Sequence, residues 1–593
     1  MAHQTPHFVA LRRVRTSRAA GLAALAAVLV LAACAWLAVK ALDARRHLLA
    51  ARTAAQAVEQ AALAGDLPAA RRALAVVQRE ASQAHHETSG PLWWAAAHVP
   101  YAGRTPRTIR DLTAILDDVA ADALPPLIRA GEVIDPARVH VVGVEVPLRP
   151  LLDSQPPLQQ AATVLTDAQN RLGRVPDTGV LGPVARARAE VVAQVGRLDD
   201  EVSRAATATA LASRMLGAQG TRHYLLALQN NAESRGTGGL MGAWGILTAK
   251  DGRVSLSRMG SVEDLPTTAP DMSGLGAGYA RLYGTDPGLW TNANESPTFP
   301  YAAQLWLSMW RRYTGHPLDG VIATDPVALG YLIGVVGPVR LSDGTTVTAA
   351  NAVATVEQHA YARYAVNRAR KTWLLQIARA VFDAVGHRRL DRHALLDALS
   401  RGVQEHRVLA YSVHPDEQRQ LASTPLGGVL PNPDASFVSL VVNNAGGNKL
   451  DYYLHRAVDY DFGTCHDGIR DSTLTVRLFN DVPRGSLPAY VTVRADTGNR
   501  SPVGSNRLLV YLFLTRGAAA RTVTVDGKPT PVVTGSEGGH PVIELPLDLA
   551  RDQTRVLVVH LQEPAYGEQP VLREQPLVVP QVSRVHWRGC GSG

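Results

Sequence analysis

The sequence predicts a multidomain α+β protein that is tethered to a membrane near its N-terminus. Three observations lead to this fold class. An uncharged run of 21 residues occupies residues 19–39, helical apolar spacing continues to about residue 215, and strand-like segments become frequent from there on. The length of 593 residues also indicates several structural units rather than one.

The composition excludes several classes of protein. Hydrophobic residues make up 46% of the chain and charged residues 19%, which is typical of folded protein and not of a disordered chain. Three cysteines are too few for a disulfide-rich scaffold or a cysteine-rich metal cluster. The formal net charge is +8, but residues 1–46 hold seven basic residues and one acidic residue, so the rest of the chain carries only +2. We therefore expect no nucleic-acid partner.

The run AAGLAALAAVLVLAACAWLAV at residues 19–39 is about as long as a helix that crosses a bilayer. Four arginines and no acidic residue precede it in residues 1–18, and the positive-inside rule places such a basic tail in the cytoplasm. We predict a single-pass protein of the cell membrane whose bulk is extracytoplasmic. A lipoprotein is the alternative, because Leu31-Ala32-Ala33-Cys34 resembles a lipobox in which Cys34 would carry the lipid.

Residues 40–215 show the spacing of amphipathic helices and are interpreted as a helical stalk. Gly65-Asp66-Leu67-Pro68 interrupts the first helix and offers Asp66 as the N-cap of a second one, which ends near His86. Apolar residues from Val184 to Val202 recur with a spacing of 3-4-4-3-4, so they form one stripe along a helix. The tryptophans in Pro91–Ala95 either contact the membrane interface or pack between helices, and packing is the commoner role.

Strands and helices alternate between residues 216 and 450, which predicts an α/β domain. The polar passage from Gln229 to Gly239 is predicted as a glycine-rich loop between two strands. The elements expected in this domain are strands at Tyr224–Leu228, Trp244–Thr248, Val254–Leu256 (after an Asp251-Gly252 turn) and residues 318–324, and helices at Val327–Gly334 and Trp373–Val385.

Residues 451–593 contain short valine-rich segments separated by turn residues, which is typical of a β-sandwich. Cys465 and Cys590 lie near the two ends of this region, and outside the reducing cytoplasm we expect a disulfide bond between them. The segments predicted as strands include Thr473–Phe479, Tyr490–Val493, Leu508–Leu514, Thr522–Val525 and Arg555–Leu561.

Sequence motifs give little support to an enzyme. There is no GxxxxGK[ST], HExxH, GxSxG or CxxC motif, so a P-loop nucleotidase, a zincin, an α/β-hydrolase and a zinc ribbon all lack support. What remains is a set of arginines near predicted strand ends, namely Arg235, Arg363, Arg368 and Arg370. Guanidinium groups bind phosphate oxygens in pairs, and glycine amides let an anion approach the backbone. We interpret this set as a candidate phosphate or pyrophosphate site, with a solvated arginine-rich surface as the alternative.

Three segments between residue 222 and about residue 456 resemble a widespread bacterial family of membrane-anchored proteins that is known only as a domain of unknown function. The segments are RHYLLALQNNAESRGTGGLMGAWGILTAKDGRV, LDGVIATDPVALGYLIGVVGPVRL and VVNNAGGNKLDYYLHR. The resemblance implies a membrane-anchored protein but no mechanism.

The order of elements is also similar to that of the LytR-CpsA-Psr family, which transfers glycopolymers from a polyprenyl-pyrophosphate carrier to the cell wall. The corresponding segments are Tyr224 to Arg235, Trp244 to Leu256, Leu318 to Gly337 and Arg368 to Val385. This resemblance implies a LytR-CpsA-Psr-like α/β domain. It also implies that Arg235, Arg368 and Arg370 bind pyrophosphate, with Arg363 nearby.

The same resemblance implies magnesium as a cofactor, but the chain departs from the family at the metal site. Thr237 stands where the family has an acidic residue. Glu233, Glu263 and Asp264 are the nearest carboxylates that could replace it as magnesium ligands. Because phosphoryl transfer relies on positioning and charge neutralisation, losing the metal ligands removes much of the catalysis, while binding can persist.

We therefore expect an envelope protein that transfers or binds a polyprenyl-pyrophosphate-linked glycan, a surface polysaccharide or a cell-wall polymer. No catalytic residue can be named from the sequence. The alternative is a non-catalytic scaffold of a polysaccharide export or cell-wall assembly machine. A deep groove lined by Arg235 and Arg368 would favour the first function, and a filled one would favour the scaffold.

Overall fold

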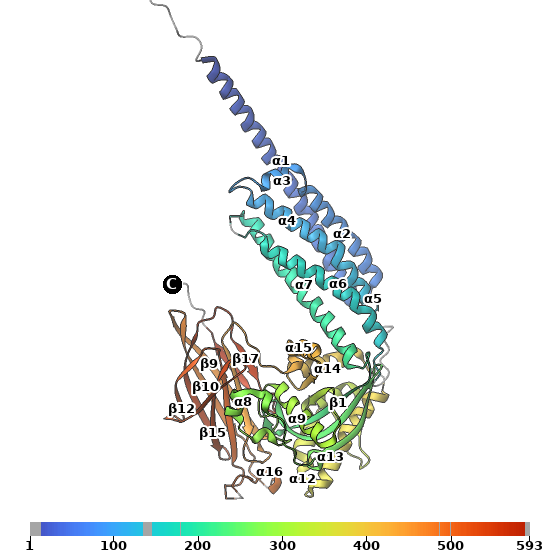
Figure 1. The fold of residues 1–593 in the computed structure, drawn as a ribbon, viewed down its shortest axis with the longest axis vertical. Helices are drawn as coiled ribbons and strands as arrows, with labels where there is room; N and C mark the ends of the chain where they lie inside the picture. Colours follow the sequence, from blue (N-terminus) through green and yellow to red (C-terminus); the bar gives the residue numbers. More distant parts are fainter. Residues whose placement is uncertain are drawn as a thin grey trace, which may run out of the picture. The chain divides into compact units, whose positions relative to one another are not determined.

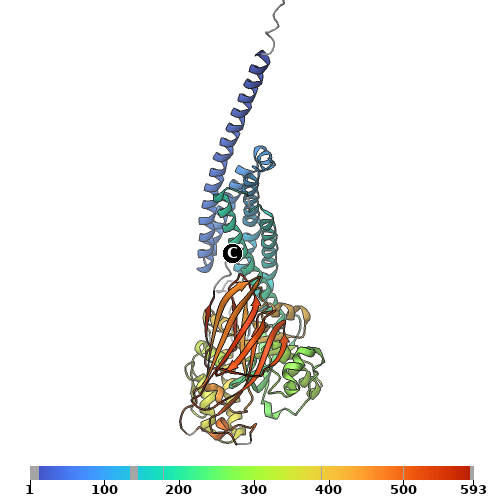
Figure 2. The same ribbon diagram turned by 90° about the vertical axis from the view of Figure 1, so that its left-hand side faces the viewer.

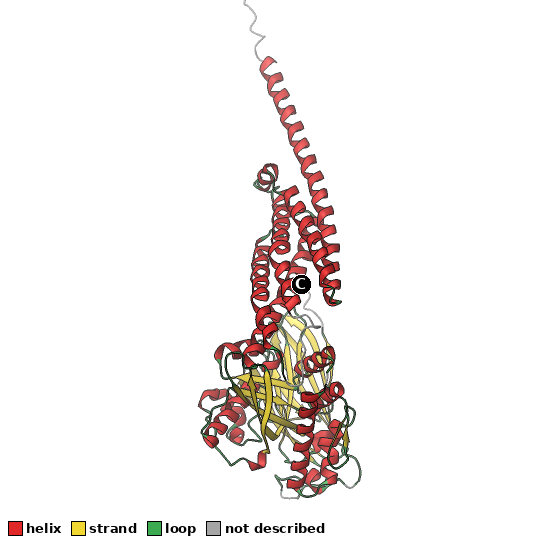
Figure 3. Cartoon of the chain, turned by 90° about the vertical axis from the view of Figure 1, so that its right-hand side faces the viewer, coloured by secondary structure: helices red, strands yellow, loops and turns green. Residues whose placement is uncertain are grey.

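The computed structural model describes residues 13–133, 145–177, 179–388, 390–485, 487–497 and 500–587. The chain divides into two compact units. The first, called here the helical unit, consists of Met1–His140 and Pro147–Arg214, and the second, the mixed unit, consists of Val141–Val146 and Met215–Gly593. Helices form the described part of the first unit, and the second combines helices with several sheets (Figure 3).

The helical unit confirms the prediction of a helical region. Asp66 caps the second helix, because its carboxylate accepts a hydrogen bond from the backbone N–H of Ala69 at 2.9 Å. The helices are α1 (Arg13–Leu63), α2 (Leu67–Thr88), α3 (Pro91–Ala97), α4 (Arg104–Asp118), the π-helical turn η1 (Val119–Ala123), α5 (Leu124–Val133), α6 (Leu148–Arg174) and α7 (Gly182–Met215).

The long helix α1 has two parts with different surroundings (Figure 1). In residues 22–39 the apolar side chains are mostly exposed, and this part is long and apolar enough to cross a membrane. Further along, Ala44, Ala51 and Ala54 are buried where α1 packs on α2. One apolar helix near the N-terminus is therefore present, which is consistent with a single membrane anchor or a signal sequence.

The core of the helical unit uses the stripe that the sequence predicted between Val184 and Val202. Val195 and Val202 of α7 belong to one hydrophobic cluster with Leu165 of α6 and with residues of α4. Trp93 is 1% exposed and packs between helices, whereas Trp94 is 56% exposed. The packing interpretation is thus correct for Trp93, whereas the side chain of Trp94 is exposed to the surroundings.

A five-stranded sheet with the strand order β3-β2-β1-β4-β7 forms the first part of the mixed unit. β1 and β4 are parallel, and the other neighbours are antiparallel. Helix α9 packs on one face, and Phe382 of α13 belongs to the cluster on the other. The strands are β1 (Arg222–Arg235), β2 (Gly238–Lys250), β3 (Arg253–Ser261), β4 (Gly320–Thr324) and β7 (Val408–Ser412).

The helices of this part confirm the two that were predicted, as α10 and α13. The longer elements are α8 (Gly276–Tyr283), α9 (Phe299–Thr314), α10 (Pro326–Val336), η5 (Thr355–His359, a π-helical turn), α13 (Asn367–His387), α14 (Arg392–Gln404) and α15 (Pro415–Ala422). The short ones are η2 (Val262–Asp264), η3 (Ser273–Leu275), η4 (Asp286–Gly288), β5 (Val339–Arg340), β6 (Thr346–Val347), α11 (Ala352–Ala354), α12 (Ala360–Arg363) and η6 (Pro425–Gly427).

The predicted loop from Gln229 to Gly239 is wrong, because this passage is a β-hairpin. β1 continues to Arg235 and β2 begins at Gly238. The polar residues can lie in a buried strand because distant groups bind them, such as the Glu357 carboxylate at the backbone N–H of Asn231, 2.7 Å away. Such partners are invisible in the local sequence, which resembles a loop.

Two further sheets, with the orders β14-β15-β11-β8-β17 and β13-β12-β16-β10-β9-β18, form the second part of the mixed unit (Figure 2). Leu512 of the first sheet and Leu474 of the second belong to one hydrophobic cluster, so their apolar faces meet. The opposite face of the first sheet, with Tyr511 and Phe513, packs in the same cluster as α9. This sheet is therefore covered on both faces.

Strand β8 already belongs to these sheets, although it precedes residue 451, where the sequence-based division begins the last domain. The strands are β8 (Phe437–Asn444), β9 (Leu454–His466), β10 (Ile469–Asn480), β11 (Asn506–Leu514), β12 (Ala519–Val525), β13 (Lys528–Pro529), β14 (Val533–Glu537), β15 (His540–Leu549), β16 (Thr554–Pro564), β17 (Val571–Glu574) and β18 (Val582–His586). The short helices are η7 (Leu450–Tyr453) and α16 (Ala489–Thr492).

The strand predicted at Tyr490–Val493 is wrong, because α16 occupies most of it. Pro488 stands at the N-cap of this turn and cannot donate a ladder hydrogen bond. The ring of Tyr490 stacks on that of Tyr361 with 5.7 Å between centroids. Tertiary packing therefore overrides the strand propensity of this short segment.

The core of the helical unit can be tested with Leu165→Ala. Leu165 is 0% exposed, so the change leaves a cavity, and we expect the free energy of unfolding to fall by about 2–5 kcal/mol. Leu152→Ala on the same helix, where the side chain is exposed, is the control and should change it by less than about 0.5 kcal/mol. Hydrogen exchange of the α6 amides measures both, and equal effects would contradict this account of the core.

Candidate functional site

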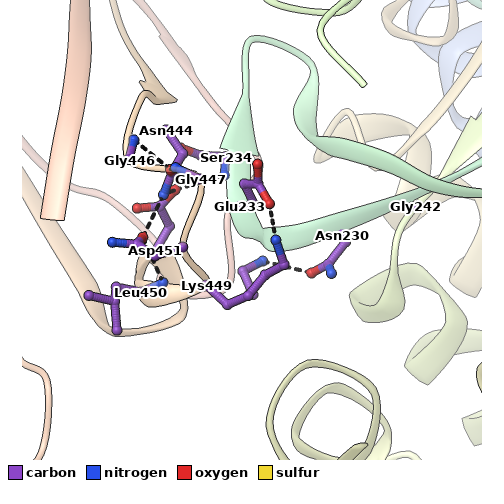
Figure 4. Close-up of polar contacts among 12 residues, drawn as sticks. Asn230, Glu233, Ser234, Gly242, Asn444, Gly446, Gly447, Lys449, Leu450 and Asp451 are labelled. Atoms are coloured by element: carbon purple, nitrogen blue, oxygen red, sulfur yellow. Dashed lines mark hydrogen bonds and ion pairs between the residues drawn. The ribbon is translucent and has the colours of Figure 1, made fainter. Parts of the chain in front are cut away.

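Charged side chains gather at the end of β1, where three parts of the mixed unit meet. The parts are the tail of β1, the loop that follows β8, and the beginning of α13. Figure 4 shows the first two, with the side chain of Lys449 directed at Glu233 and that of Asp451 beside Ser234 and Asn444. We call the residues Arg235, Arg370, Lys371 and Lys449, together with Glu233, the cation cluster.

Glu233 lies between two cations in the interior. Lys449 forms an ion pair with its Oε2 atom, and a guanidinium nitrogen of Arg235 lies 3.3 Å from its Oε1 atom. All three side chains are buried. Burial alone would raise the pKa of Glu233, but Lys449 and Arg235 outweigh it and hold the pKa below its ordinary value. The carboxylate is therefore ionised.

The protein binds both terminal guanidinium nitrogens of Arg235, while its Nε atom is buried without a hydrogen-bond partner among the described residues. Its guanidinium donates hydrogen bonds to the carbonyl oxygens of Ser234 at 2.8 Å and Asn444 at 3.2 Å, and to Oδ1 of Asn292 at 2.9 Å. A Cβ atom at Gly236 would lie 2.2 Å from the carbonyl oxygen of Glu295. The space that the hairpin glycine leaves is thus filled by backbone of this chain.

Asp451 joins the loop after β8 to the tail of β1. Its carboxylate accepts hydrogen bonds from the backbone N–H and the hydroxyl of Ser234, both at 2.7 Å. Asn506 and Asn444 donate to it as well, at 2.6 Å and 3.0 Å. Burial raises the pKa of Asp451, while these hydrogen bonds oppose the shift. This carboxyl group, together with the Lys449–Glu233 ion pair, therefore fixes the loop to β1.

Arg370 reaches the cluster from α13 and is 1% exposed. Its guanidinium carbon lies 4.0 Å from the ring centroid of Tyr490 and 4.9 Å from that of Tyr361, which are cation–π distances. It donates to the carbonyl oxygen of Tyr364 at 3.0 Å. Its Nε atom is buried and has no hydrogen-bond partner within the described part of the chain.

Lys371 is the member of the cluster that reaches solvent, with 18% of its side chain exposed. Its ammonium group donates to the carbonyl oxygen of Gly242 at 3.4 Å and lies 4.0 Å from the Glu263 carboxylate. Burial lowers the pKa of Lys371; the Glu263 carboxylate opposes this, and the positive charges of Lys449 and Arg370 add to it. The cluster therefore holds four cations, of which Arg235 and Lys449 pair with the buried Glu233 carboxylate.

The other two predicted arginines lie elsewhere. Arg363 forms an ion pair with Asp343 at 3.0 Å and lies over the ring of Trp373 at 5.5 Å. Arg368 is exposed, and its side chain makes no hydrogen bond or ion pair with another described residue. Of the four arginines, only Arg235 and Arg370 thus belong to the cation cluster.

The three carboxylates considered as magnesium ligands are held by separate partners. Glu233 is ion-paired as above, Glu263 accepts from the amide of Asn367 at 2.6 Å, and Asp264 accepts from the backbone N–H of Ser261 at 2.9 Å. In the ranges that the structure describes, no three His, Cys, Asp or Glu side chains are placed to hold a metal ion. These carboxylates therefore do not fit a shared magnesium site.

The structure shows the bonding state of two of the three cysteines. Cys465 at the end of β9 is disulfide-bonded. Cys590 lies outside the described residues, so its pairing with Cys465 stays a prediction. Cys34 is exposed in α1 and has a free thiol. Lipidation of Cys34 also stays a prediction.

Sequence reasoning missed Lys449 and Asp451, although both lie in the segment VVNNAGGNKLDYYLHR. One signal was available, because the chain has only five lysines and two of them, Lys371 and Lys449, belong to this cluster. The polar run directly after an apolar strand was a second signal. Neither shows that the side chains meet residues more than 200 positions away, such as Glu233.

Glu357 of η5 is buried beside the same strand. Its Oε1 atom accepts the backbone N–H of Asn231 at 2.7 Å, and its Oε2 atom has no partner among the described side chains. Burial raises the pKa of Glu357 to about 8, so the carboxyl group is protonated at neutral pH. Its ordinary value is 4.5.

The ion pair in the cluster can be tested with Lys449→Met. The change leaves the Glu233 carboxylate buried with one cation fewer, and we expect a loss of about 3–5 kcal/mol in the free energy of unfolding of the mixed unit. Lys250→Met, at an exposed lysine on β2, is the control and should cost less than about 0.5 kcal/mol. Urea unfolding measures both, and an equally small loss for Lys449→Met would show that the pair contributes little.

Glu357 predicts a pH dependence of stability. The folded state keeps its proton up to about pH 8, whereas the unfolded chain releases it near pH 4.5, so this group makes stability fall as the pH rises between these values. Glu357→Gln should remove this contribution. The free energy of unfolding of the variant, measured by urea unfolding, should therefore rise steadily relative to that of the wild type from pH 5 to pH 8. The exposed Glu568→Gln is the control. A stability difference for Glu357→Gln that stays constant over this range would contradict the assignment.

The comparison with known families covers part of this site. A family model described as "Protein of unknown function (DUF4012)" matches residues 219–361, and no curated protein matches the chain. The matched range includes β1, β2 and Glu357, and it ends at Tyr361, which stacks on Arg370. The loop with Lys449 and Asp451 lies outside it. The chain therefore contains a DUF4012 domain over residues 219–361.

Proposed function

We propose that this chain is a membrane-anchored, extracytoplasmic protein of the cell envelope that binds the phosphate groups of a lipid-linked or surface glycan. The observation that carries the proposal is the excess of positive charge in the cation cluster. Of its four cations only Arg235 and Lys449 pair with the buried Glu233 carboxylate, and Lys371 is the one that reaches solvent. The exposed apolar part of α1 supplies the anchor in this proposal.

An anion would complete the charge balance of the cluster. A buried charge without a partner is costly, and among the described residues Glu263 provides the one carboxylate within ion-pair distance of Lys371, at 4.0 Å. The lowered pKa of Lys371 reflects this cost, because burial, and after it the positive charges of Lys449 and Arg370, disfavour the protonated form. A phosphate or pyrophosphate oxygen at Lys371 would reverse the effect by stabilising the ammonium group.

The proposal is binding rather than transfer. Phosphoryl transfer depends on positioned charge, usually with metal ions, and Glu233, Glu263 and Asp264 are each held by other groups. In this proposal the five-stranded sheet and its helices form a LytR-CpsA-Psr-like domain, and the two facing sheets form a β-sandwich. The ligand would be a polyprenyl-pyrophosphate-linked glycan or a cell-wall polymer.

A second candidate function is that of a scaffold in a polysaccharide export or cell-wall assembly machine. The observation that favours it is that protein groups bind both terminal guanidinium nitrogens of Arg235. A strand end that is filled by its own chain leaves no groove for a ligand at that arginine. The two functions differ in whether Lys371 binds an anion.

The test is the binding of inorganic pyrophosphate to the full-length protein in detergent micelles, measured by calorimetry. Lys371→Met should weaken binding by at least about tenfold, because it removes one charge-assisted contact. Lys250→Met is the matched control and should bind like the wild type. Wild-type affinity should fall as the pH rises through the lowered pKa of Lys371, because only the protonated amine binds.

Lys371→Arg sharpens this test, because a guanidinium keeps its charge at every accessible pH. The variant should bind pyrophosphate without the decline at high pH. Absence of pyrophosphate binding by the wild type, or equal affinity in the Lys371→Met variant, would favour the scaffold.

A further inference from the structure

An open hollow of about 500 Å³ lies at the β3 edge of the five-stranded sheet. Its volume is within the range of small-ligand sites in proteins. The strands β2 and β3 and the helices α9 and α13 contribute its walls. The lining residues that carry the argument are Trp244, Arg258, Trp310, Tyr313 and Arg379.

One wall of the hollow is aromatic and rigid. The rings of Trp244 and Trp310 are 5.2 Å apart, and those of Trp310 and Tyr313 are 6.2 Å apart, both in edge-to-face arrangements. The indole N–H of Trp244 donates to the carbonyl oxygen of Ser261 at 3.0 Å, which fixes the ring. A Cβ atom at Gly260 would lie 2.8 Å from this ring, so the glycine lets the indole lie against β3.

Two arginines on different elements add positive charge to the lining of the hollow. Arg258 lies on β3 and Arg379 on α13, and both are exposed. Neither guanidinium forms a hydrogen bond or an ion pair with any residue that the structure describes. The lining of the hollow contains no acidic residue. The hollow therefore offers two unpaired cations beside an apolar wall, of which Tyr313 is 47% exposed.

We infer that this hollow binds a saccharide unit that carries a carboxylate or a phosphate. An aromatic face carries partial negative charge and attracts the C–H groups of a sugar ring, while an arginine binds an anionic group through paired hydrogen bonds. A neutral sugar would leave both arginines without a partner. A nucleic acid would need a basic track, and the chain outside its first 46 residues carries a net charge of only +2. The inference goes beyond the proposed phosphate site, because it does not involve Lys371.

The hollow and the cation cluster both include a residue of helix α13. Arg379 follows Lys371 by eight residues, which places them about 12 Å apart along the helix axis. A phosphorylated glycan of a few units spans such a distance. The two sites can nevertheless be tested independently, since they share no side chain.

The experiment is calorimetric titration of the full-length protein in detergent micelles with three probes: an oligogalacturonate, a hexose 1-phosphate and a neutral maltooligosaccharide. We expect at least one anionic probe to bind and the neutral one to bind at least tenfold more weakly. The anionic probe that binds identifies the carboxylate or the phosphate as the recognised group.

The double variant R258A/R379A should weaken binding of the anionic probe at least tenfold, and Tyr313→Ala should weaken it as well. R281A/R311A removes two exposed arginines outside the hollow and is the matched control, with unchanged affinity expected. R258A/R379A should leave the binding of pyrophosphate unchanged, because this anion is too short to span the two sites, and this separates failure here from failure of the phosphate site. The inference is overturned if no anionic probe binds or if R258A/R379A binds the anionic probe like the wild type.

Discussion

The carboxyl group of Asp451 and the ion pair of Glu233 with Lys449 hold the end of β1 against the loop that follows β8. Both contacts are buried, and together they join residues that lie more than 200 positions apart in the sequence. A polar strand tail such as Asn230–Arg235 can be buried only when its backbone and side chains have partners. The packing of the end of β1 against β8 and the loop that follows it depends on these partners.

The segment that follows β17 completes the same junction. The amide of Gln575 donates to the carbonyl oxygens of Arg235 at 2.7 Å and Val442 at 2.8 Å, and the amide of Asn231 donates to the carbonyl oxygen of Pro576 at 2.8 Å. Residues from the beginning, middle and end of the mixed unit therefore share one polar network. Partly satisfied networks of this kind are costly, which explains why an anion beside Lys371 would matter to the whole unit.

The side-chain contacts separate the residues that the protein itself binds from the one that reaches solvent. Arg235 and Arg370, which sequence reasoning selected as ligand-binding, are largely held by the protein itself. Lys371, which was only a neighbour in the sequence, is the member that reaches solvent. The guanidinium groups of Arg235 and Arg370 contact carbonyl oxygens or tyrosine rings and stabilise the interior. Lys371 has fewer protein partners, so its ammonium group is the one that can bind a ligand.

The sequence alone determined the features that depend on local pattern. The apolar helix near the N-terminus, the capping of α2 by Asp66, the amphipathic α7 and most strands follow from composition and periodicity. Tertiary structure decided where polar segments go: the hairpin at Gln229–Gly239, the helical turn at Tyr490 and the pairing of Glu233 with Lys449. The physical reason is that a buried polar group is stabilised by a specific distant partner, whereas a periodic apolar face requires only a core.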